Sequence, residues 1–252
     1  MYIKQYVSLL YYLIYLTQLL VFLIVKPAFC EVTLDEIETK WKSPYVDPIA
    51  SKVFIGGSAL TLFLVANKKG LIDPVQKDAS EDKPLGEWAN FGDVMGMSVP
   101  NALYLGGMYG HYKYTGNSLS YHRAIYMFEA SAYAGMTTVV LKRLFGQRRP
   151  NKGDNLSFPS GHTTTATAFA TVVAMEHELY WGLPASLIAA TVGYSRINDN
   201  AHYLHDVVFG ATLGISYGIA LQKFHTKEKS NISVIPVYVD NENFRIAMNF
   251  TW

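Results

Sequence analysis

The stretch from Pro159 to Met175 reads Pro-Ser-Gly-His-Thr-Thr-Thr-Ala-Thr-Ala-Phe-Ala-Thr-Val-Val-Ala-Met. It opens with a polar cluster that suits a helix start and continues as an apolar helical segment rich in small side chains. Two further polar clusters, at residues 142–150 and 195–206, adjoin other apolar segments. Because all three clusters lie at helix ends, we expect them to converge at one end of an all-α bundle and to form one cationic, histidine-bearing pocket.

Length and composition set the class of protein. The chain has 252 residues, of which 50% are hydrophobic and 14% aromatic, so it can bury one good-sized core without a second domain. A net charge of +1 argues against nucleic acid as a partner. A single cysteine, Cys30, excludes both a disulfide framework and a cysteine metal site.

Apolar helical segments are predicted at residues 53–65, 94–110, 124–141, 160–175, 179–195 and 203–221. Their Gly, Ala, Ser and Thr residues permit close helix packing. We therefore expect a helical bundle of about six apolar helices within a domain at residues 53–229, with the active site at one end. Residues 66–91 are expected to be the longest irregular link inside it.

The two ends of the chain differ from this pattern. Residues 31–52 are expected to be a polar N-terminal segment. In residues 230–252 the helical period gives way to alternation, with Phe244, Ile246, Met248 and Phe250 on one face. This predicts a short C-terminal β-hairpin that packs against the bundle.

The first 30 residues resemble an export signal. Lys4 precedes an apolar run at residues 6–25, and Ala28 stands at a position that a signal peptidase reads. We expect residues 1–30 to be cleaved and the mature chain to be exported to the cell envelope. The alternative is an uncleaved anchor helix, because the run approaches the roughly 20 residues that span a bilayer.

The lengths of the predicted helices bear on whether the bundle crosses a membrane. Most predicted helices are shorter than a full span, and Pro100, Glu129 and Pro184 interrupt them. If the mature N-terminus is exported and three helices cross before Lys142, the pocket would face the cytoplasm. We expect a membrane-associated protein with a periplasm-facing site, and both an embedded and a peripheral bundle remain possible.

The clusters contain the parts of a site for a tetrahedral oxyanion. Lys142, Arg149 and Arg196 are cations at helix ends, and arginine presents a fork that matches phosphate oxygens. Ser160 and Gly161 open a helix, where backbone N–H groups and the helix dipole can hold an anion.

Two histidines accompany this site. His202 and Asp206 are four residues apart on one helix face, so the carboxylate can accept from one ring nitrogen and leave the other as a nucleophile. His162 lies beside the proposed anion site and suits proton transfer.

Each feature also has an ordinary explanation. The cations at residues 142–149 could be a solvated helix end, and Ser160 a simple N-cap. His202, His205 and Asp206 could bind a metal, but no second motif completes a ligand set. If the clusters formed no functional site, all these ordinary explanations would have to be true at the same time.

The combination resembles the type 2 phosphatidic acid phosphatase superfamily, which includes lipid phosphatases, bacterial acid phosphatases and vanadium haloperoxidases. Its three signatures, K-x6-R-P, P-S-G-H and S-R-x5-H-x3-D, all occur here in order, and the resemblance covers about residues 90–222. It implies hydrolysis without a metal or other cofactor. It also implies that His202 is the nucleophile, that Asp206 orients it and that His162 is the general acid. The residues that it assigns to phosphate binding are Lys142, Arg149, Ser160, Gly161 and Arg196.

We therefore expect a phosphatase that hydrolyses a phosphate monoester or pyrophosphate through a phosphohistidine. Apolar helices and the export signal favour a phosphorylated membrane lipid as substrate. The runner-up is a periplasmic acid phosphatase for soluble phosphomonoesters. A vanadium haloperoxidase and a non-catalytic phosphate-binding membrane protein are the remaining alternatives.

Overall fold

A computed structural model describes residues 33–226, 232–238 and 244–250. The expected export signal at residues 1–30 lies outside the described residues. The described chain is dominated by helices, and the predicted all-α fold is confirmed. Its helices are α2 (Leu34–Val46), α3 (Ala50–Ala66), the π-helix η1 (Lys68–Ile72), α4 (Asp73–Asp82), α5 (Trp88–Gly96), α6 (Val99–Thr115), α7 (Ser118–Phe145), α8 (Gly161–Asn198) and α9 (Leu204–Thr226).

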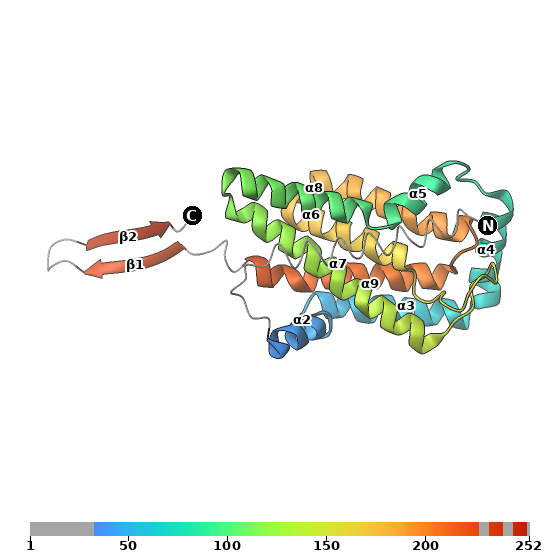
Figure 1. Ribbon diagram of the computed structural model, residues 1–252. Coiled ribbons are helices and arrows are strands. Elements are labelled where there is room, and N and C mark those ends of the chain that lie inside the picture. The colour runs from blue at the N-terminus through green and yellow to red at the C-terminus, as the bar shows by residue number, and fades with distance from the viewer. Residues whose placement is uncertain (1–32, 227–231, 239–243, 251–252) are drawn as a thin grey trace.

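Helices α7, α8 and α9 form the centre of an elongated bundle (Figure 1). Helix α5 packs on α8, α6 on α7, and α3 on α9. The core between them is built from fully buried side chains such as Tyr126, Met127, Val172, Tyr217 and Leu221. Helix α2 and the start of α7 lie at one end of the bundle, whereas the end of α7 and the starts of α8 and α9 lie at the other.

The contact between α8 and α9 depends on glycines spaced four residues apart on α9. Gly210, Gly214 and Gly218 face α8 so closely that an added Cβ at Gly214 would lie 2.3 Å from the Thr164 carbonyl oxygen. Such an approach is open only to residues without a side chain. The stripe therefore holds the first turns of α8 and α9, which carry two of the polar clusters, side by side.

Two helix breaks shape the bundle. Residues 94–110 were predicted as one helix, but the chain breaks between α5 and α6 at Met97 and Ser98, where Ser98 has a φ of 64°. Pro100 explains the break, because proline has no N–H for an interior helix bond and is accepted in a first turn. The second break, at His177 and Glu178 inside α8, falls between the predicted segments 160–175 and 179–195.

The prediction of an irregular link at residues 66–91 was wrong, because this stretch contains η1, α4 and the start of α5. Pro74 stands in the first turn of α4, where it supports a helix instead of ending one. The buried Gln76 donates to Asn200 Oδ1 at 2.8 Å, and the Leu85 amide donates to Asn198 Oδ1 at 3.2 Å. The link therefore lies against the end of α8 at the polar-cluster end of the bundle.

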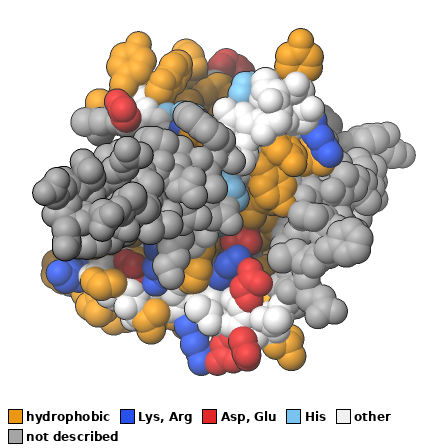
Figure 2. All heavy atoms as spheres, turned by 90° about the vertical axis from the view of Figure 1, so that its left-hand side faces the viewer, with side chains coloured by type: hydrophobic (Ala, Val, Ile, Leu, Met, Phe, Trp, Pro, Cys, Tyr) orange, Lys and Arg blue, Asp and Glu red, His pale blue; other side chains and the backbone are white. Residues whose placement is uncertain are grey.

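A buried ion cluster ties α2 into the opposite end. Lys40 Nζ lies 2.8 Å from Glu129 Oε1, and His225 Nε2 lies 3.2 Å from Glu129 Oε2. All three side chains are buried. The carboxylate of Glu129 is tolerated inside the apolar helix α7 because Lys40 and His225 both pair with it. Figure 2 looks onto this end, where charged side chains of both signs gather along the lower edge near α2.

Within the described residues, α7 and α9 are long and apolar enough to cross a membrane. The pair α2–α3, bent by 63°, passes the same test when taken together. Exposed apolar side chains such as Leu62, Leu103 and Val139 face outward from the bundle. These features are those of a membrane protein.

Two strands follow the bundle. Strands β1 (Ile232–Tyr238) and β2 (Phe244–Phe250) pair antiparallel, with Ile232 opposite Phe250 and Tyr238 opposite Phe244. Residues 239–243, which would make the turn, lie outside the described residues. The C-terminal hairpin as a unit, its packing against the bundle, and the division into segments at residues 31–52, 53–229 and 230–252 stay predictions.

The α8–α9 contact leads to a stability prediction. Gly214→Ala should lower the free energy of unfolding by about 1–3 kcal/mol, because its Cβ would overlap Thr167 and the α8 backbone. Gly107→Ala in α6 is the matched control, since nothing lies within 4 Å of a Cβ there. It should be neutral or stabilising by up to about 1 kcal/mol. Thermal unfolding in detergent measures both, and equal Tm values would contradict the packing described.

Candidate active site

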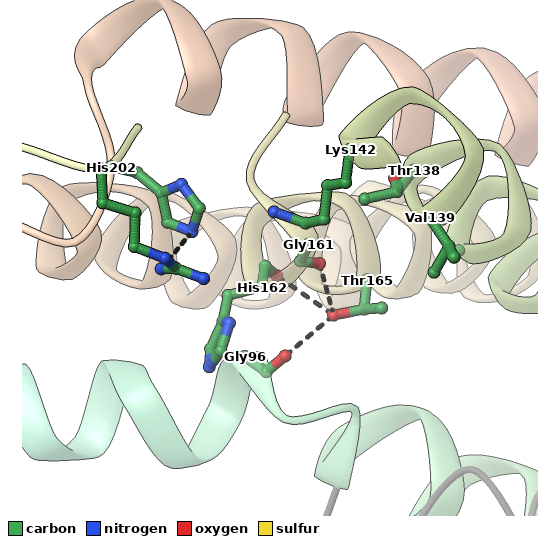
Figure 3. Close-up of a pocket in the computed structure, with 10 residues that line it drawn as sticks. Gly96, Thr138, Val139, Lys142, Gly161, His162, Thr165 and His202 are labelled. Atoms are coloured by element: carbon green, nitrogen blue, oxygen red, sulfur yellow. Dashed lines mark hydrogen bonds between the residues drawn. The ribbon is translucent and has the colours of Figure 1, made fainter. Parts of the chain in front are cut away.

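The three polar clusters meet at one end of the bundle. They come from the last turn of α7 and the loop after it, from the first turn of α8, and from the α8–α9 junction. Between them lies a cavity of about 190 Å³ (Figure 3). Its lining residues are Gly96, Gly135, Thr138, Val139, Lys142, Arg149, Gly161, His162, Thr165 and His202. Five of the eight sequence-predicted site residues therefore line one cavity, whereas Ser160, Arg196 and Asp206 lie behind its wall.

Lys142 reaches the cavity from the last turn of α7. Its Nζ donates to the carbonyl oxygens of Leu156 at 2.5 Å and Ser157 at 3.3 Å. The loop after α7 therefore folds back over the lysine. The ammonium is held at the cavity wall with two of its three donors directed at the backbone.

Arg149 comes from the same loop. Its Nε donates to Asp154 Oδ1 at 2.7 Å, while Nη1 lies 3.3 Å from the Ala201 carbonyl oxygen and 3.2 Å from His202 Nε2. Because arginine can only donate, His202 Nε2 must accept and carries no proton. This contact decides the tautomer of His202.

The proton of neutral His202 therefore lies on Nδ1, which faces Asp206 Oδ2 at 3.6 Å. His202 is 2% exposed. Burial lowers the pKa of His202 to about 4, although the Asp206 carboxylate acts in the opposite direction; the charges of Lys142 and Arg149 lower it further. The ring is thus neutral above about pH 4, with its unprotonated nitrogen at the cavity.

Asp206 is fully buried and shared by several donors. Its Oδ2 accepts from Ser157 Oγ at 2.5 Å and from the Tyr203 amide at 2.8 Å. His205 Nε2 lies 3.1 Å from Oδ1, and 2.9 Å from the Gln147 side chain. Among the described residues, no three His, Cys, Asp or Glu side chains are placed to hold a metal together.

Ser160 differs from its expected part in anion binding. Its hydroxyl caps α8, accepting from Thr163 Oγ1 at 2.9 Å, and its amide donates to the Asp206 carbonyl oxygen at 3.0 Å. Ser160 therefore joins the start of α8 to α9, while its neighbour Gly161 lines the cavity. A direct contact of Ser160 with a bound anion stays a prediction.

Arg196 is buried behind His162 and bonded on every side of its guanidinium. Its Nη1 donates to Asp93 Oδ1, Nη2 to Asp199 Oδ2 at 3.0 Å, and Nε to Ser195 Oγ at 3.1 Å. Asp93 Oδ1 also lies 3.1 Å from His162 Nε2. Direct phosphate binding by Arg196 stays a prediction.

Sequence reasoning missed three residues of this site: Asp93, Asp154 and Ser157. Asp93 offered the one usable signal, a carboxylate between two glycines in an otherwise apolar segment. Asp154 and Ser157 lie in a polar loop, where nothing in the sequence separates them from their neighbours.

Parts of the chain are similar to known proteins. The model of the PAP2 superfamily matches residues 123–230. A lipid A 1-phosphatase of Porphyromonas gingivalis is 39% identical over 80 residues, which are 31% of this chain and 18% of that protein. A lipid A 1-phosphatase of Rhizobium etli is 30% identical over 106 residues, 35% of this chain and 44% of that protein. The chain thus spans less than half the length of these curated relatives.

The fold is also that of a solved structure. The transmembrane PAP2-type phosphatidylglycerolphosphate phosphatase of Bacillus subtilis aligns with a TM-score of 0.56 at 19% identity, over 75% of this chain and 99% of that one. The matched residues 123–230 contain all three signatures and the cavity residues of α7, α8 and α9. Residues 123–230 are therefore similar to the PAP2 superfamily, the type 2 phosphatidic acid phosphatases that the signatures of this chain resemble.

Proposed function

We propose that this chain is a phosphatase that hydrolyses a phosphate monoester or pyrophosphate of a membrane lipid through a phosphohistidine at His202. The observation that carries the proposal is the state of His202. Its Nε2 accepts from Arg149 and therefore carries a lone pair instead of a proton, beside a cavity that also holds Lys142, Gly161 and His162. A substrate phosphate that accepts the Arg149 N–H in its place releases this lone pair for attack on phosphorus.

In the first step, the lone pair of His202 Nε2 attacks phosphorus and the bond from phosphorus to the leaving oxygen breaks. The electron pair stays on that oxygen, which takes a proton from His162. Asp206 faces Nδ1–H and stabilises the positive ring that forms. Its present 3.6 Å separation from Nδ1 is longer than a hydrogen bond, as such contacts often are before substrate binds.

In the second step, water attacks phosphorus while His162 takes one of its protons. The nitrogen–phosphorus bond breaks, its electron pair returns to His202, and inorganic phosphate leaves. Lys142 and Arg149, with the α8 start at Gly161, stabilise the charge on the transferring group. The scheme uses no metal, and all its proton transfers go through the chain's own histidines.

A lipid substrate is supported by the wall of the cavity. Gly135 and Val139 of α7 line it, and α7 is one of the two described helices that could span a membrane without a partner. Val139 is 54% exposed, and Met136 and Val140 beside it are also exposed. The cavity thus adjoins an outward-facing apolar surface, on which lipid chains could lie while the phosphate enters the pocket. The relatives named above are phosphatases of lipid A and of phosphatidylglycerolphosphate by their names.

A periplasm-facing pocket belongs to the same proposal, and it requires either that the bundle does not fully cross the bilayer or that residues 1–30 do not carry α2 outward. Helix α2 lies at the opposite end of the bundle from the pocket. If the bundle spans the bilayer, the two ends therefore lie on opposite sides of the membrane.

The proposed nucleophile predicts a trapped intermediate. Rapid acid-free quenching with ³²P-labelled substrate should leave acid-labile, base-stable label on the wild type and none on His202→Ala. The variant should lose activity by at least about 10³-fold, because no other group can form the covalent bond. Asp206→Asn should lose about 10²–10⁴-fold, since it no longer favours the required tautomer. Near-normal turnover of His202→Ala would refute the nucleophile.

The proposed lipid entry predicts a change in substrate preference. A Cβ at Gly135 would meet nothing within 4 Å, so Gly135→Leu should fold and narrow the cavity wall. We expect kcat/KM to fall by about 10-fold or more for a long-chain lipid phosphate. For p-nitrophenyl phosphate it should change by less than about 3-fold.

Gly106→Leu on α6 is the matched control, because that glycine has equal space and does not line the cavity. It should leave kcat/KM unchanged for both substrates. If Gly135→Leu lowers kcat/KM equally for both substrates, a soluble phosphomonoester becomes the better supported substrate.

The proposed orientation predicts labelling from outside. In a Cys30→Ser background, Asn155→Cys lies in the exposed loop beside the pocket and Thr39→Cys on exposed α2 at the far end. An impermeant thiol reagent on intact spheroplasts should label Asn155→Cys and, for a spanning bundle, not Thr39→Cys. Labelling of both would indicate a peripheral bundle. Labelling of Thr39→Cys alone would place the pocket in the cytoplasm and refute the orientation.

A further inference from the structure

Helix α5 lies outside the three signatures and outside the residues that the family model matches, yet it packs directly on the site. Two glycines make this possible. An added Cβ at Gly92 would lie 2.5 Å from Ser195 Oγ, and one at Gly96 would lie 2.5 Å from His162 Cδ2. Both positions exclude a side chain, so α5 approaches two of the signatures as closely as a helix can.

Asp93 stands between these two glycines. Its Oδ1 accepts from Arg196 Nη1 and lies 3.1 Å from His162 Nε2. One carboxylate oxygen thus joins a residue of the second signature to a residue of the third. The side chain is 35% exposed, whereas Arg196 is nearly buried.

Charge balance of Arg196 alone does not explain this arrangement. Asp199 already pairs with the guanidinium at 3.0 Å from the same helix, and Ser195 accepts from its third nitrogen. A second carboxylate is therefore not required to neutralise the arginine. What Asp93 adds is the contact between its Oδ1 and His162 Nε2.

We infer that Asp93 is a positioning residue for His162 in proton transfer to the leaving group. This inference rests on the proposed function. By accepting from Nε2, the carboxylate orients the ring and opposes burial and the Arg196 charge, which both lower the pKa of His162. Arg196, held by Asp199 and Ser195, fixes the carboxylate in turn. The site then contains two histidine–carboxylate pairs, His202 with Asp206 for the nucleophile and His162 with Asp93 for the acid.

The test compares leaving groups. An alkyl phosphate, such as a lipid phosphate, needs a proton on its leaving oxygen, whereas p-nitrophenolate leaves without one. Asp93→Asn should lower kcat/KM by about 10–100-fold for the lipid phosphate and by less than about 3-fold for p-nitrophenyl phosphate. This ratio is the right measure because it ends with departure of the leaving group and excludes the later water step, in which His162 also acts. Inhibition by inorganic phosphate should stay within about 3-fold, which shows that the pocket still forms. Asp78 is an exposed carboxylate of α4, and Asp78→Asn is the matched control. It should leave kcat/KM unchanged for both substrates.

A double-mutant cycle separates positioning from general support of the fold. In a His162→Ala background, Asp93→Asn should cause no further loss beyond about 2-fold, because the group on which it acts is gone. Two outcomes would overturn the inference and show that Asp93 acts through Arg196. One is that the activity losses of the two variants add. The other is that Asp93→Asn lowers activity equally on both substrates and also weakens inhibition by phosphate.

The inference and the proposed function can fail separately. If His162→Ala lowers kcat/KM equally for both substrates, His162 is not the proton donor, and the inference falls together with that part of the proposed function. If His162→Ala shows the leaving-group dependence and Asp93→Asn does not, only the inference is overturned.

Discussion

The site end of this bundle depends on the burial of one carboxylate, Asp206. A carboxylate without solvent is costly unless donors surround it, and here they come from the loop after α7 and from residues 202–205. Ser157 donates from the loop after α7, Tyr203 from the start of α9, and the backbone of Asp206 accepts from Ser160 at the start of α8. The side chain of Asp206 thus fixes the loop after α7 to the start of α9, and its backbone carbonyl fixes the start of α8 to the same turn.

The same arrangement separates the surroundings of the two histidines. His202 is enclosed between Arg149 and Asp206, which leaves one ring nitrogen unprotonated beside the cavity. His162 meets the half-buried carboxylate of Asp93, on the far side of the cavity from α7. Two histidines with different partners suit two different tasks, because a nucleophile must stay neutral whereas an acid must carry a proton.

Much of this could be predicted from sequence because the three signatures are short, ordered and placed at the ends of apolar segments. The spacing of His202 and Asp206 identified their pairing, and Gly161 and His162 were expected at a helix start. The break at Ser98 and the helices in residues 66–91 were missed, because proline ends a helix in one position and begins one in another. Asp93 was missed for a different reason: its importance arises from the close approach of Gly92 and Gly96 to α8, which is a property of packing and not of local pattern.

The position of α2 restricts how the bundle, the export signal and the pocket can be combined. Lys40 is buried against Glu129 and donates to Glu36, so α2 is fixed to the end opposite the pocket and cannot swing toward it without leaving Glu129 short of a partner. A cleaved signal would deliver α2 to the outside, and a bundle that crosses the bilayer would then put the pocket inside. A periplasmic pocket therefore requires either that the bundle does not fully cross the membrane or that residues 1–30 do not carry α2 outward. The buried pair of Lys40 and Glu129, far from any substrate, thus links the fate of the N-terminus to the side on which the chemistry takes place.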